Sequence, residues 1–311
     1  MGNELSLRLN TEYRMAEIAQ KRHQTAEGYT AALLSAFTFG LIPLFSVPLL
    51  ADGMPTSTVL MYRFLFATLA MSIYVLVRKS SLRITRQQFV WLLLLSFLYF
   101  ATAHLLLTGY EFISSGMATV LHFTYPIFVA LLMLLIFHVR LSKRGMMAIM
   151  AAVAGVSLVS GVTSSEPINP EGPALVITSG FLYAVYIITV NKSVARTLSH
   201  EALTFYILLI TTIFLSLYCI ADDKMVLPAS AMDWTNLVLL GVLSTTISNI
   251  TLVKAIDLIG STPTAVMGAL EPMTAVMVGV IAFGEVLTPI RILGILMILV
   301  AVVLLTTDKS K

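Results

Sequence analysis

The stretch MATVLHFTYPIFVALLMLLIF, residues 117–137, contains no Asp, Glu, Lys or Arg. A helix that crosses the hydrocarbon core of a bilayer needs roughly 20 predominantly apolar residues, and this stretch has that length. The strands of a membrane β-barrel are shorter, about 10 residues, and they alternate polar with apolar positions. The stretch therefore predicts a transmembrane helix and excludes a barrel.

Nine more apolar blocks of similar length flank this one, separated by short polar connections. Within the ten blocks, only Arg63, Glu271 and Arg291 are charged. The predicted spans cover residues 29–50, 58–77, 89–107, 117–137, 145–162, 173–190, 202–220, 237–253, 263–283 and 287–305.

The composition agrees with a chain that lies mostly in lipid. Of its 311 residues, 58% are hydrophobic and 11% are charged, and the mean hydropathy is +0.93. Soluble domains carry about 25% charged residues, so we expect an all-α polytopic membrane protein. A soluble enzyme, a secreted disulfide scaffold and a nucleic-acid binder are excluded. The single cysteine, Cys219, allows no intramolecular disulfide and no cysteine-built metal site.

The basic residues predict the orientation, because Lys and Arg are enriched in cytoplasmic loops. With the N-terminus inside, sixteen of the nineteen Lys and Arg residues fall on the inner side. Only Lys224 and Arg291 fall on the outer side, where the loops carry acids instead. We therefore expect an integral protein of the inner or plasma membrane with both termini in the cytoplasm, and residues 1–27 as a polar cytoplasmic tail.

The chain repeats itself, because residues 110–141 align without gaps on residues 256–287. The identical pairs at this shift of 146 are Ile113/Ile259, Ser115/Ser261, Val120/Val266, Pro126/Pro272, Phe137/Phe283 and Leu141/Leu287. At a shift of 144, the matching pairs are Gly28/Gly172, Ser35/Ser179 and Phe37/Phe181. Residues 28–163 and 172–306 are therefore predicted to be two five-helix repeats.

Five helices per repeat is an odd number, so the second repeat must enter the membrane from the opposite side. Inverted repeats related by a pseudo-two-fold axis are a transporter architecture, with the substrate site near the midplane between the halves. If the two halves adopt different conformations and exchange them, the site opens to one side and then to the other. The sequence thus predicts alternating access.

Three motifs carry a family resemblance. They are Tyr62-Arg63-Phe64 in the second span, Gly268-Ala269-Leu270-Glu271-Pro272 in the ninth, and Gly284-Glu285-Val286-Leu287-Thr288 followed by Gly294. With ten spans in two inverted halves, the chain resembles the EamA-type transporters of the drug/metabolite transporter superfamily over residues 28–306. The first half departs from the family, because it reads Phe137-His138-Val139-Arg140-Leu141-Ser142 where a glutamate often follows the fourth helix.

The resemblance implies secondary transport of small metabolites, often export of amino acids or similar solutes, without ATP hydrolysis. It also implies that the first, third, fourth, sixth, eighth and ninth spans line the substrate site. The missing acid in the first half argues against a symmetrical role for Glu285.

Glu271 is the most informative polar residue, because an acid inside a membrane usually faces the bundle interior or a water-filled path. Pro272 frees a backbone carbonyl one turn earlier, so it can kink the helix and let the acid reach a cavity. Glu271 is then a protonatable group or a partner for a substrate amine, or else a structural or gating acid.

Two histidines lie within the predicted spans. His122 can share a helical face with Tyr125 and Pro126, and His104 lies in the preceding span. A neutral imidazole donates and accepts at once, which suits a polar solute or a proton relay. Hydrogen bonding between helices is the alternative for each histidine.

Further cavity candidates lie in the second half. The eighth span carries Ser244, Thr245, Thr246, Ser248 and Asn249, of which Asn249 is the likelier cavity residue and Ser248 a second candidate. Tyr183 and Tyr186 are three residues apart and could form an aromatic wall, with core packing as the alternative.

For Arg63 we favour snorkelling to the outer interface over binding of a substrate carboxylate. With Pro126, Pro272 and Glu285, it forms the predicted gating or structural set.

The alternative function is an intramembrane enzyme or a channel that acts on a small polar or lipid-linked substrate. The sequence contains no H-E-x-x-H, no G-x-G-D and no phosphate-binding loop. Repeated filter sequences of the kind that channels use are also absent. We therefore expect no enzyme activity, no cofactor and no metal. The expected partners are a small solute, the lipid bilayer and a coupling proton, in a monomer or a homodimer.

Overall fold

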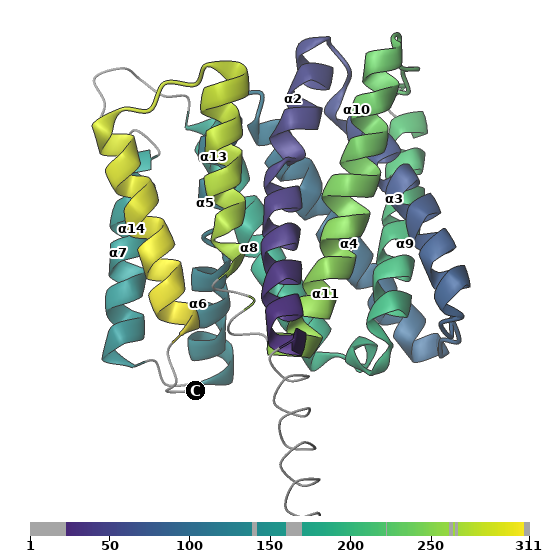
Figure 1. Ribbon diagram of the computed structural model, residues 1–311, viewed down its shortest axis with the longest axis horizontal. Coiled ribbons are helices and arrows are strands. Elements are labelled where there is room, and N and C mark those ends of the chain that lie inside the picture. The colour runs from purple at the N-terminus through teal and green to yellow at the C-terminus, as the bar shows by residue number, and fades with distance from the viewer. Residues whose placement is uncertain are drawn as a thin grey trace, which may run out of the picture.

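The computed structural model describes residues 23–138, 142–159, 170–221, 223–260, 264 and 267–307. Within these residues all regular structure is helical (Figure 1). The first helix covers residues 23–40 and continues after a turn at Leu41 into α2 (Ile42–Ala51). The other elements are α3 (Thr56–Arg78), α4 (Arg86–Gly109), α5 (Ser115–His122), α6 (Tyr125–Phe137), α7 (Lys143–Val159), α8 (Glu171–Lys192), η1 (Val194–Thr197), α9 (His200–Ala221), α10 (Ala231–Gly241), η2 (Val242–Ile247), α11 (Ser248–Ile259), α13 (Leu270–Phe283) and α14 (Pro289–Thr306).

Seven helical segments of the described chain are long and apolar enough to cross a membrane. They are His23–Ala51, Thr56–Arg78, Arg86–Gly109, Ser115–Phe137, Glu171–Lys192, His200–Ala221 and Ala231–Ile259. The shorter helices α7, α13 and α14 bring the crossings to the predicted ten. The prediction of an all-α polytopic membrane protein is therefore confirmed.

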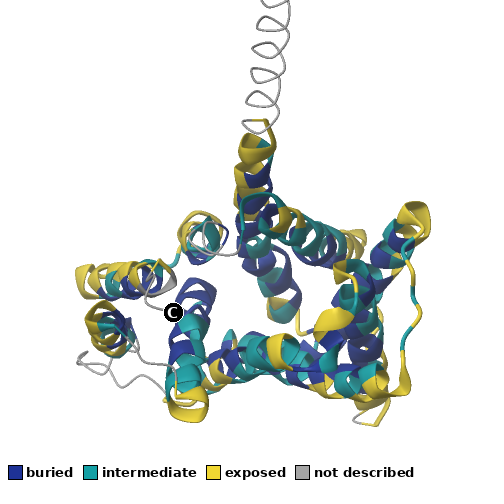
Figure 2. Cartoon of the chain, turned by 90° about the horizontal axis from the view of Figure 1, so that it is seen from below, coloured by how far each residue is buried: buried dark blue, intermediate teal, exposed yellow. Residues whose placement is uncertain are grey.

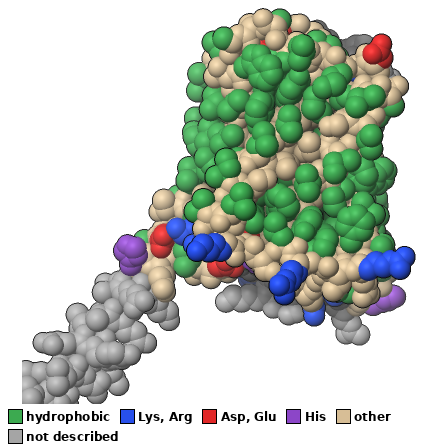
Figure 3. Space-filling view, turned by 90° about the vertical axis from the view of Figure 1, so that its right-hand side faces the viewer, with side chains coloured by type: hydrophobic (Ala, Val, Ile, Leu, Met, Phe, Trp, Pro, Cys, Tyr) green, Lys and Arg blue, Asp and Glu red, His purple; other side chains and the backbone are tan. Residues whose placement is uncertain are grey.

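The described chain begins and ends at the same end of the bundle, which we call the near end (Figure 1). The opposite end, which holds the α2–α3 and α13–α14 connections, is the far end. On the face seen in Figure 3, Lys and Arg side chains follow the near end, and an acidic side chain marks the far end. The described basic residues of the near-end segments are Arg78, Lys79, Arg83, Arg86, Lys143, Arg144, Lys192, Arg196 and Lys254. The polar tail, apart from residues 23–27, and both chain ends lie outside the described residues.

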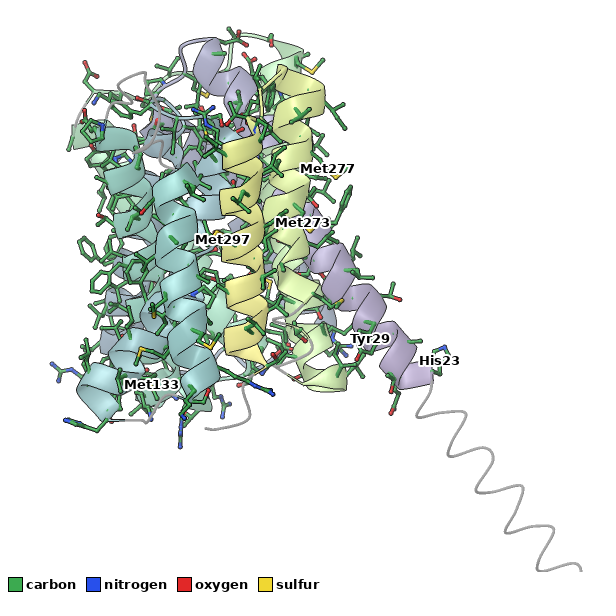
Figure 4. All side chains as sticks on the ribbon, turned by 90° about the vertical axis from the view of Figure 1, so that its left-hand side faces the viewer. His23, Tyr29, Met133, Met273, Met277 and Met297 are labelled. Carbon is green, nitrogen blue, oxygen red and sulfur yellow. The ribbon has the colours of Figure 1, made fainter. Side chains whose placement is uncertain are left out.

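Apolar side chains cover the outside of the helices, as expected for a chain surrounded by lipid. Seen from the near end, exposed residues lie on the outer sides of the helices and buried ones mostly face inward (Figure 2). Met273 and Met277 of α13, for example, are exposed on its outer side (Figure 4). The helices α7 and α14 approach closely at two glycines, since a Cβ added to Gly155 would lie 2.7 Å from the carbonyl oxygen of Gly294. Small residues allow this kind of contact between membrane helices.

The ends of α6 and α13 repeat each other in detail. His138 and Gly284, 146 positions apart, both have left-handed backbone conformations, with φ of 54° and 65°. Each amide donates to a carbonyl five residues earlier, on Met133 and Gly279. The helices that follow, α7 and α14, also begin 146 positions apart. The sequence repeat is therefore a structural repeat.

Contacts between the two halves also occur in related pairs. Gly28 lies against the side chain of Ile259, and Gly172 lies against the side chain of Ile113. These glycines are 144 positions apart and these isoleucines 146, so each half makes the same contact with the other. One contact lies at the near end and the other at the far end, because the first helix and α8 run in opposite directions (Figure 1).

Some hydrogen bonds between the halves also occur in pairs that the repeat relates. Ser35 Oγ donates to the carbonyl of Ser248 at 2.8 Å, and Ser179 Oγ donates to the carbonyl of Thr102 at 2.7 Å. The hydroxyls of Thr68 and Thr212, residues 144 positions apart, bond to each other at 3.0 Å. Because these two residues are equivalent in the repeat, their contact lies on the pseudo-two-fold axis between α3 and α9.

Candidate functional site

A cavity lined by tyrosines lies between α4, α8, α9 and α11. It encloses about 310 Å³ of empty space including its mouth. Its lining residues are Tyr99, Tyr183, Tyr186, Thr204, Ile207, Leu208 and Asn249. Helices from both halves contribute, so the cavity lies between the two repeats, as a transporter of this architecture requires.

A second hollow continues the cavity toward the near end. It shares Thr204 and Asn249 with the first and encloses about 260 Å³. Its other lining residues are Met71, Tyr74, His200, Glu201, Ile250 and Val253. His200 begins α9, and Tyr74 lies in the last turns of α3, so this hollow reaches the near end of the bundle.

Four tyrosine rings form a continuous aromatic wall. The Tyr183 and Tyr186 rings stack with centroids 5.6 Å apart and an interplanar angle of 10°. Tyr125 packs edge-on against Tyr183 at 4.8 Å, and Tyr99 lies 5.4 Å from Tyr186. The structure thus brings the predicted residues Tyr125, Tyr183 and Tyr186 together. Tyr99 was missed, although its position in the middle of the third predicted span is the same signal that singled out Tyr183.

Glu271 lies deep in the bundle, in the first turn of α13. Its carboxylate is close enough to the Arg63 guanidinium for the two charges to interact, and it also interacts with Tyr125 and Tyr183. The side chain is only half-buried although protein surrounds it. Glu271 therefore lies inside the bundle, within electrostatic range of Arg63 and of two tyrosines of the wall.

Paired interruptions in two spans position these residues. The fourth span breaks at Phe123 and Thr124, and the ninth has a turn at Ala269. A proline follows each break, Pro126 near the start of α6 and Pro272 in the first turn of α13. Proline fits the first turn of a helix, because no intrahelical partner awaits its missing amide there.

Arg63 does not snorkel to the membrane interface, so that expectation was wrong. Its side chain is buried, with 6% exposed, and its Nε donates to Thr245 Oγ1 at 2.9 Å. Thr245 lies in the π-helical turn η2, where its hydroxyl also bonds the carbonyl of Leu240 at 2.9 Å. The sequence could not reveal this partner, because the π-turn decides which way Thr245 points. Arg63 therefore places a cation inside the bundle, within electrostatic range of Glu271 and Tyr99.

Asn249 and Ser248 have different environments. Asn249 lines both hollows, its Nδ2 donates to the Thr245 carbonyl at 2.6 Å, and its side chain bonds to the Tyr99 hydroxyl. Ser248 is fully buried, and its hydroxyl bonds back to carbonyls of its own helix, including that of Ser244 at 2.9 Å. Asn249 is therefore at the cavity, whereas Ser248 packs between helices.

His122 ends α5 behind the tyrosine wall, with its ring 5.5 Å from that of Tyr183. Its Nδ1 lies 3.1 Å from Ser179 Oγ. Ser179 gives its single proton to the carbonyl of Thr102, so Nδ1 of His122 must be the donor to Ser179. This hydrogen bond fixes the tautomer and leaves Nε2 as an acceptor.

His104 lies apart from this group. Its ring packs against Phe100 and Tyr218, with centroids 5.8 Å and 5.6 Å away, between α4 and α9. His104 is five residues from Tyr99, which turns it to another face of α4. The structure therefore does not bring His104 together with His122 and Glu271.

Glu285 lies at the far end, away from the tyrosines. It follows Gly284, and its carboxylate accepts hydrogen bonds from the amide and the hydroxyl of Ser115, both at 3.0 Å. It therefore joins the second half to the first.

Comparisons with known proteins bear on the whole chain. A family model described as the EamA-like transporter family matches residues 26–161 and 171–307. An uncharacterized transporter of Synechocystis sp. is 31% identical over 222 residues, which cover 68% of this chain and 65% of that protein. The matched part is thus slightly less than two thirds of that relative's length. A solved crystal structure with 16% sequence identity superposes with a TM-score of 0.65 over 92% of this chain and 97% of the other, which shows a shared fold.

Proposed function

Because this chain belongs to the EamA-like transporter family, and so to the drug/metabolite transporter superfamily, we propose that it is a secondary carrier of small zwitterionic solutes such as amino acids. In this proposal the tyrosine-lined cavity is the substrate site. The two inverted halves exchange conformations and expose the site alternately to the two sides of the membrane.

One observation carries the choice of solute. Two opposite charges inside the bundle, buried Arg63 from the first half and half-buried Glu271 from the second, lie within electrostatic range of each other and of the aromatic wall. A zwitterion presents a carboxylate to the first and an ammonium to the second, and its side chain can lie against the rings of Tyr183 and Tyr186. Opposite charges fixed in a low-dielectric site favour a ligand that carries both charges.

The direction we propose is export. The hollow that continues the cavity lies on the near side, and the basic residues of the described loops gather at the near end. If that end is cytoplasmic, as the enrichment of Lys and Arg in cytoplasmic loops suggests, the site is open to the cytoplasm in this conformation. The membrane would then be the inner or plasma membrane.

Proton exchange is the coupling we propose, with Glu271 as the group that carries the proton. A carboxyl group that faces an internal space can exchange a proton with that space, and a neighbouring substrate ammonium changes the cost of its charge. Proton and substrate would then bind at linked sites, as an antiporter requires.

Proteoliposomes test this proposal with a panel of radiolabelled amino acids. Counterflow should appear for at least one of them, and an outwardly directed substrate gradient should move protons the other way. A channel gives flux without counter-stimulation, and an enzyme converts its substrate without a membrane.

The matched variant is Glu271→Gln, which keeps the shape of the side chain but cannot titrate. Exchange at equal concentrations should be weakened but retained, because the glutamine carbonyl still accepts a hydrogen bond from the substrate ammonium, whereas pH-driven accumulation should be lost. Accumulation that persists in the glutamine variant would refute the role given to Glu271, and the absence of counterflow for the whole panel would refute the solute class.

A further inference from the structure

The far ends of the two halves meet at the Glu285 carboxylate. Its Oε1 accepts hydrogen bonds from the Ser115 amide and hydroxyl, both at 3.0 Å, at the first residue of α5. The amides of a helix N-terminus favour a negative charge, because they have no partner within the helix. The carboxylate therefore caps a helix of the other half.

Two glycines make room for this carboxylate. A Cβ on Gly279 of α13 would collide with the Glu285 side chain, and a Cβ on Gly116 of α5 would lie 3.0 Å from Oε2. Gly279 also accepts the Glu285 amide through its carbonyl at 2.9 Å, which fixes the turn after α13. The carboxylate thus occupies a fitted space between α5 and α13.

A second contact holds α5 one turn closer to the middle of the bundle. Thr119, one turn further along α5, is buried, and its hydroxyl lies 3.1 Å from that of Tyr110. Thr119 gives its own proton to the carbonyl of Ser115, so Tyr110 is the donor. Hydrogen bonds thus hold α5 at two successive levels on the far side, whereas the described hollows beside the tyrosines lie toward the near end.

The first half has no acid at the position equivalent to Glu285. A shift of 146 places Ser261 opposite Ser115 but Val139 opposite Glu285. Both Ser261 and Val139 lie outside the described residues, so the comparison is one of sequence alone. The contacts of Gly28, Ser35 and Thr68 with the other half occur as equivalent pairs, and the Glu285 contact departs from this symmetry.

We infer that Glu285 is a one-sided latch that holds the far ends of α5 and α13 together and biases the carrier toward the conformation open at the near end. The inference rests on the proposed alternating access. A valine side chain cannot accept hydrogen bonds, so the sequence offers no matching carboxylate for the state closed at the near end. Hydrogen bonds to a charged group contribute enough to change a conformational equilibrium by roughly tenfold each.

Two reporter cysteines in a Cys219→Ser background test the latch in detergent, where both ends of the protein are accessible. Thr119→Cys reports access to α5 from the far end. Thr204→Cys reports access to the two hollows from the near end. The measured quantity is the rate of labelling by a small hydrophilic methanethiosulfonate. When Glu285 is unchanged, the near reporter (Thr204→Cys) should label quickly and the far reporter (Thr119→Cys) slowly.

Glu285→Val removes both hydrogen bonds, so it should raise the labelling rate of the far reporter by roughly tenfold to a hundredfold and lower that of the near reporter. Gly279→Ala should do the same while keeping the acid, because the added methyl displaces the carboxylate. The matched control is Asp52→Asn, which removes an exposed acid from the same end but leaves the Glu285–Ser115 contact intact, and it should change neither rate.

Opposite changes in the two reporters support the latch, because a loosened protein would raise both rates. Unchanged rates, or a rise in both, would overturn it. These results are independent of transport: counterflow that survives with unchanged reporters refutes the latch alone, and responsive reporters without counterflow refute the proposed function alone.

Discussion

Arg63 and Glu271 place opposite charges inside the bundle, within electrostatic range of the tyrosine wall. In the repeat, Arg63 corresponds to Ile207 and Glu271 corresponds to Tyr125, so neither charge has a charged counterpart. The equivalent contacts that hold the halves together, such as those of Ser35 and Ser179, keep their polar character. The charged residues of the site therefore lie at positions where the two halves have different residues. The contacts that hold the halves together lie at positions where both halves have the same residue type.

The cavity side chains should matter for transport more than for folding. Tyr183→Ala and Asn249→Ala should each lower counterflow by about tenfold or more, because they remove a ring face and an amide from the wall of the site. Membrane levels should fall less than counterflow does, since both side chains border empty space.

His104→Ala is the matched comparison, because His104 is a polar residue of the same membrane region that lies apart from the cavity. It should leave counterflow near the unmodified level. Equal losses of counterflow and of protein abundance in the Tyr183 and Asn249 variants would mean that those side chains only pack.

At the level of helices, α7 and α14 pack closely against each other across the two halves. Gly155 and Gly294 face each other, and a Cβ on either would lie within 2.8 Å of the carbonyl oxygen of the other. Carbonyl oxygens belong to the helix backbone, so a larger side chain forces the helices apart instead of turning aside.

Gly155→Leu should therefore destabilise the protein by about 1–3 kcal/mol, the usual cost of overpacking. Thermal unfolding in detergent measures the effect. Gly268→Leu is a control, because a Cβ there would meet only the ring of Phe123 at 4.0 Å. A Gly155→Leu protein as stable as the unmodified one would show that the helices are not held at this distance.

Sequence alone predicted the spans well, because runs of apolar residues must become helices in lipid. The described helices begin and end within a few residues of most predicted spans, for example α3 at Thr56–Arg78 for the span 58–77. The eighth span is longer than predicted, because polar Asp233 caps its start: Asp233 accepts from the Ser230 amide, and Ser230 accepts from the Asp233 amide.

The site was only partly predictable. Glu271, Tyr125, Tyr183, Tyr186 and Asn249 were named because a polar side chain in mid-membrane needs a partner. The burial of Arg63 depends on the π-turn η2, and the separation of His104 from the cavity depends on which face of α4 meets α9. These are relations between elements, and a sequence without aligned relatives does not record them.

At the scale of the whole molecule, the orientation in the membrane is a prediction from charge. Cysteines at positions 2 and 310 should both be shielded from an impermeant thiol reagent in intact cells, and one at position 168 should be labelled. The physical reason is the gathering of Lys and Arg at the near end. If positions 2 and 310 label differently, the termini lie on opposite sides of the membrane and the number of crossings is odd.

Alternating access requires the far ends of α5 and α13 to part during each transport cycle. Cysteines at Gly116 and Val276 face each other across this contact, since a Cβ at position 116 would lie 3.0 Å from the Cα of Val276. In a Cys219→Ser background, counterflow should stop when the pair is oxidised and return when it is reduced, with each single cysteine unaffected by oxidation. Full counterflow in the oxidised, cross-linked carrier would contradict alternating access through this gate.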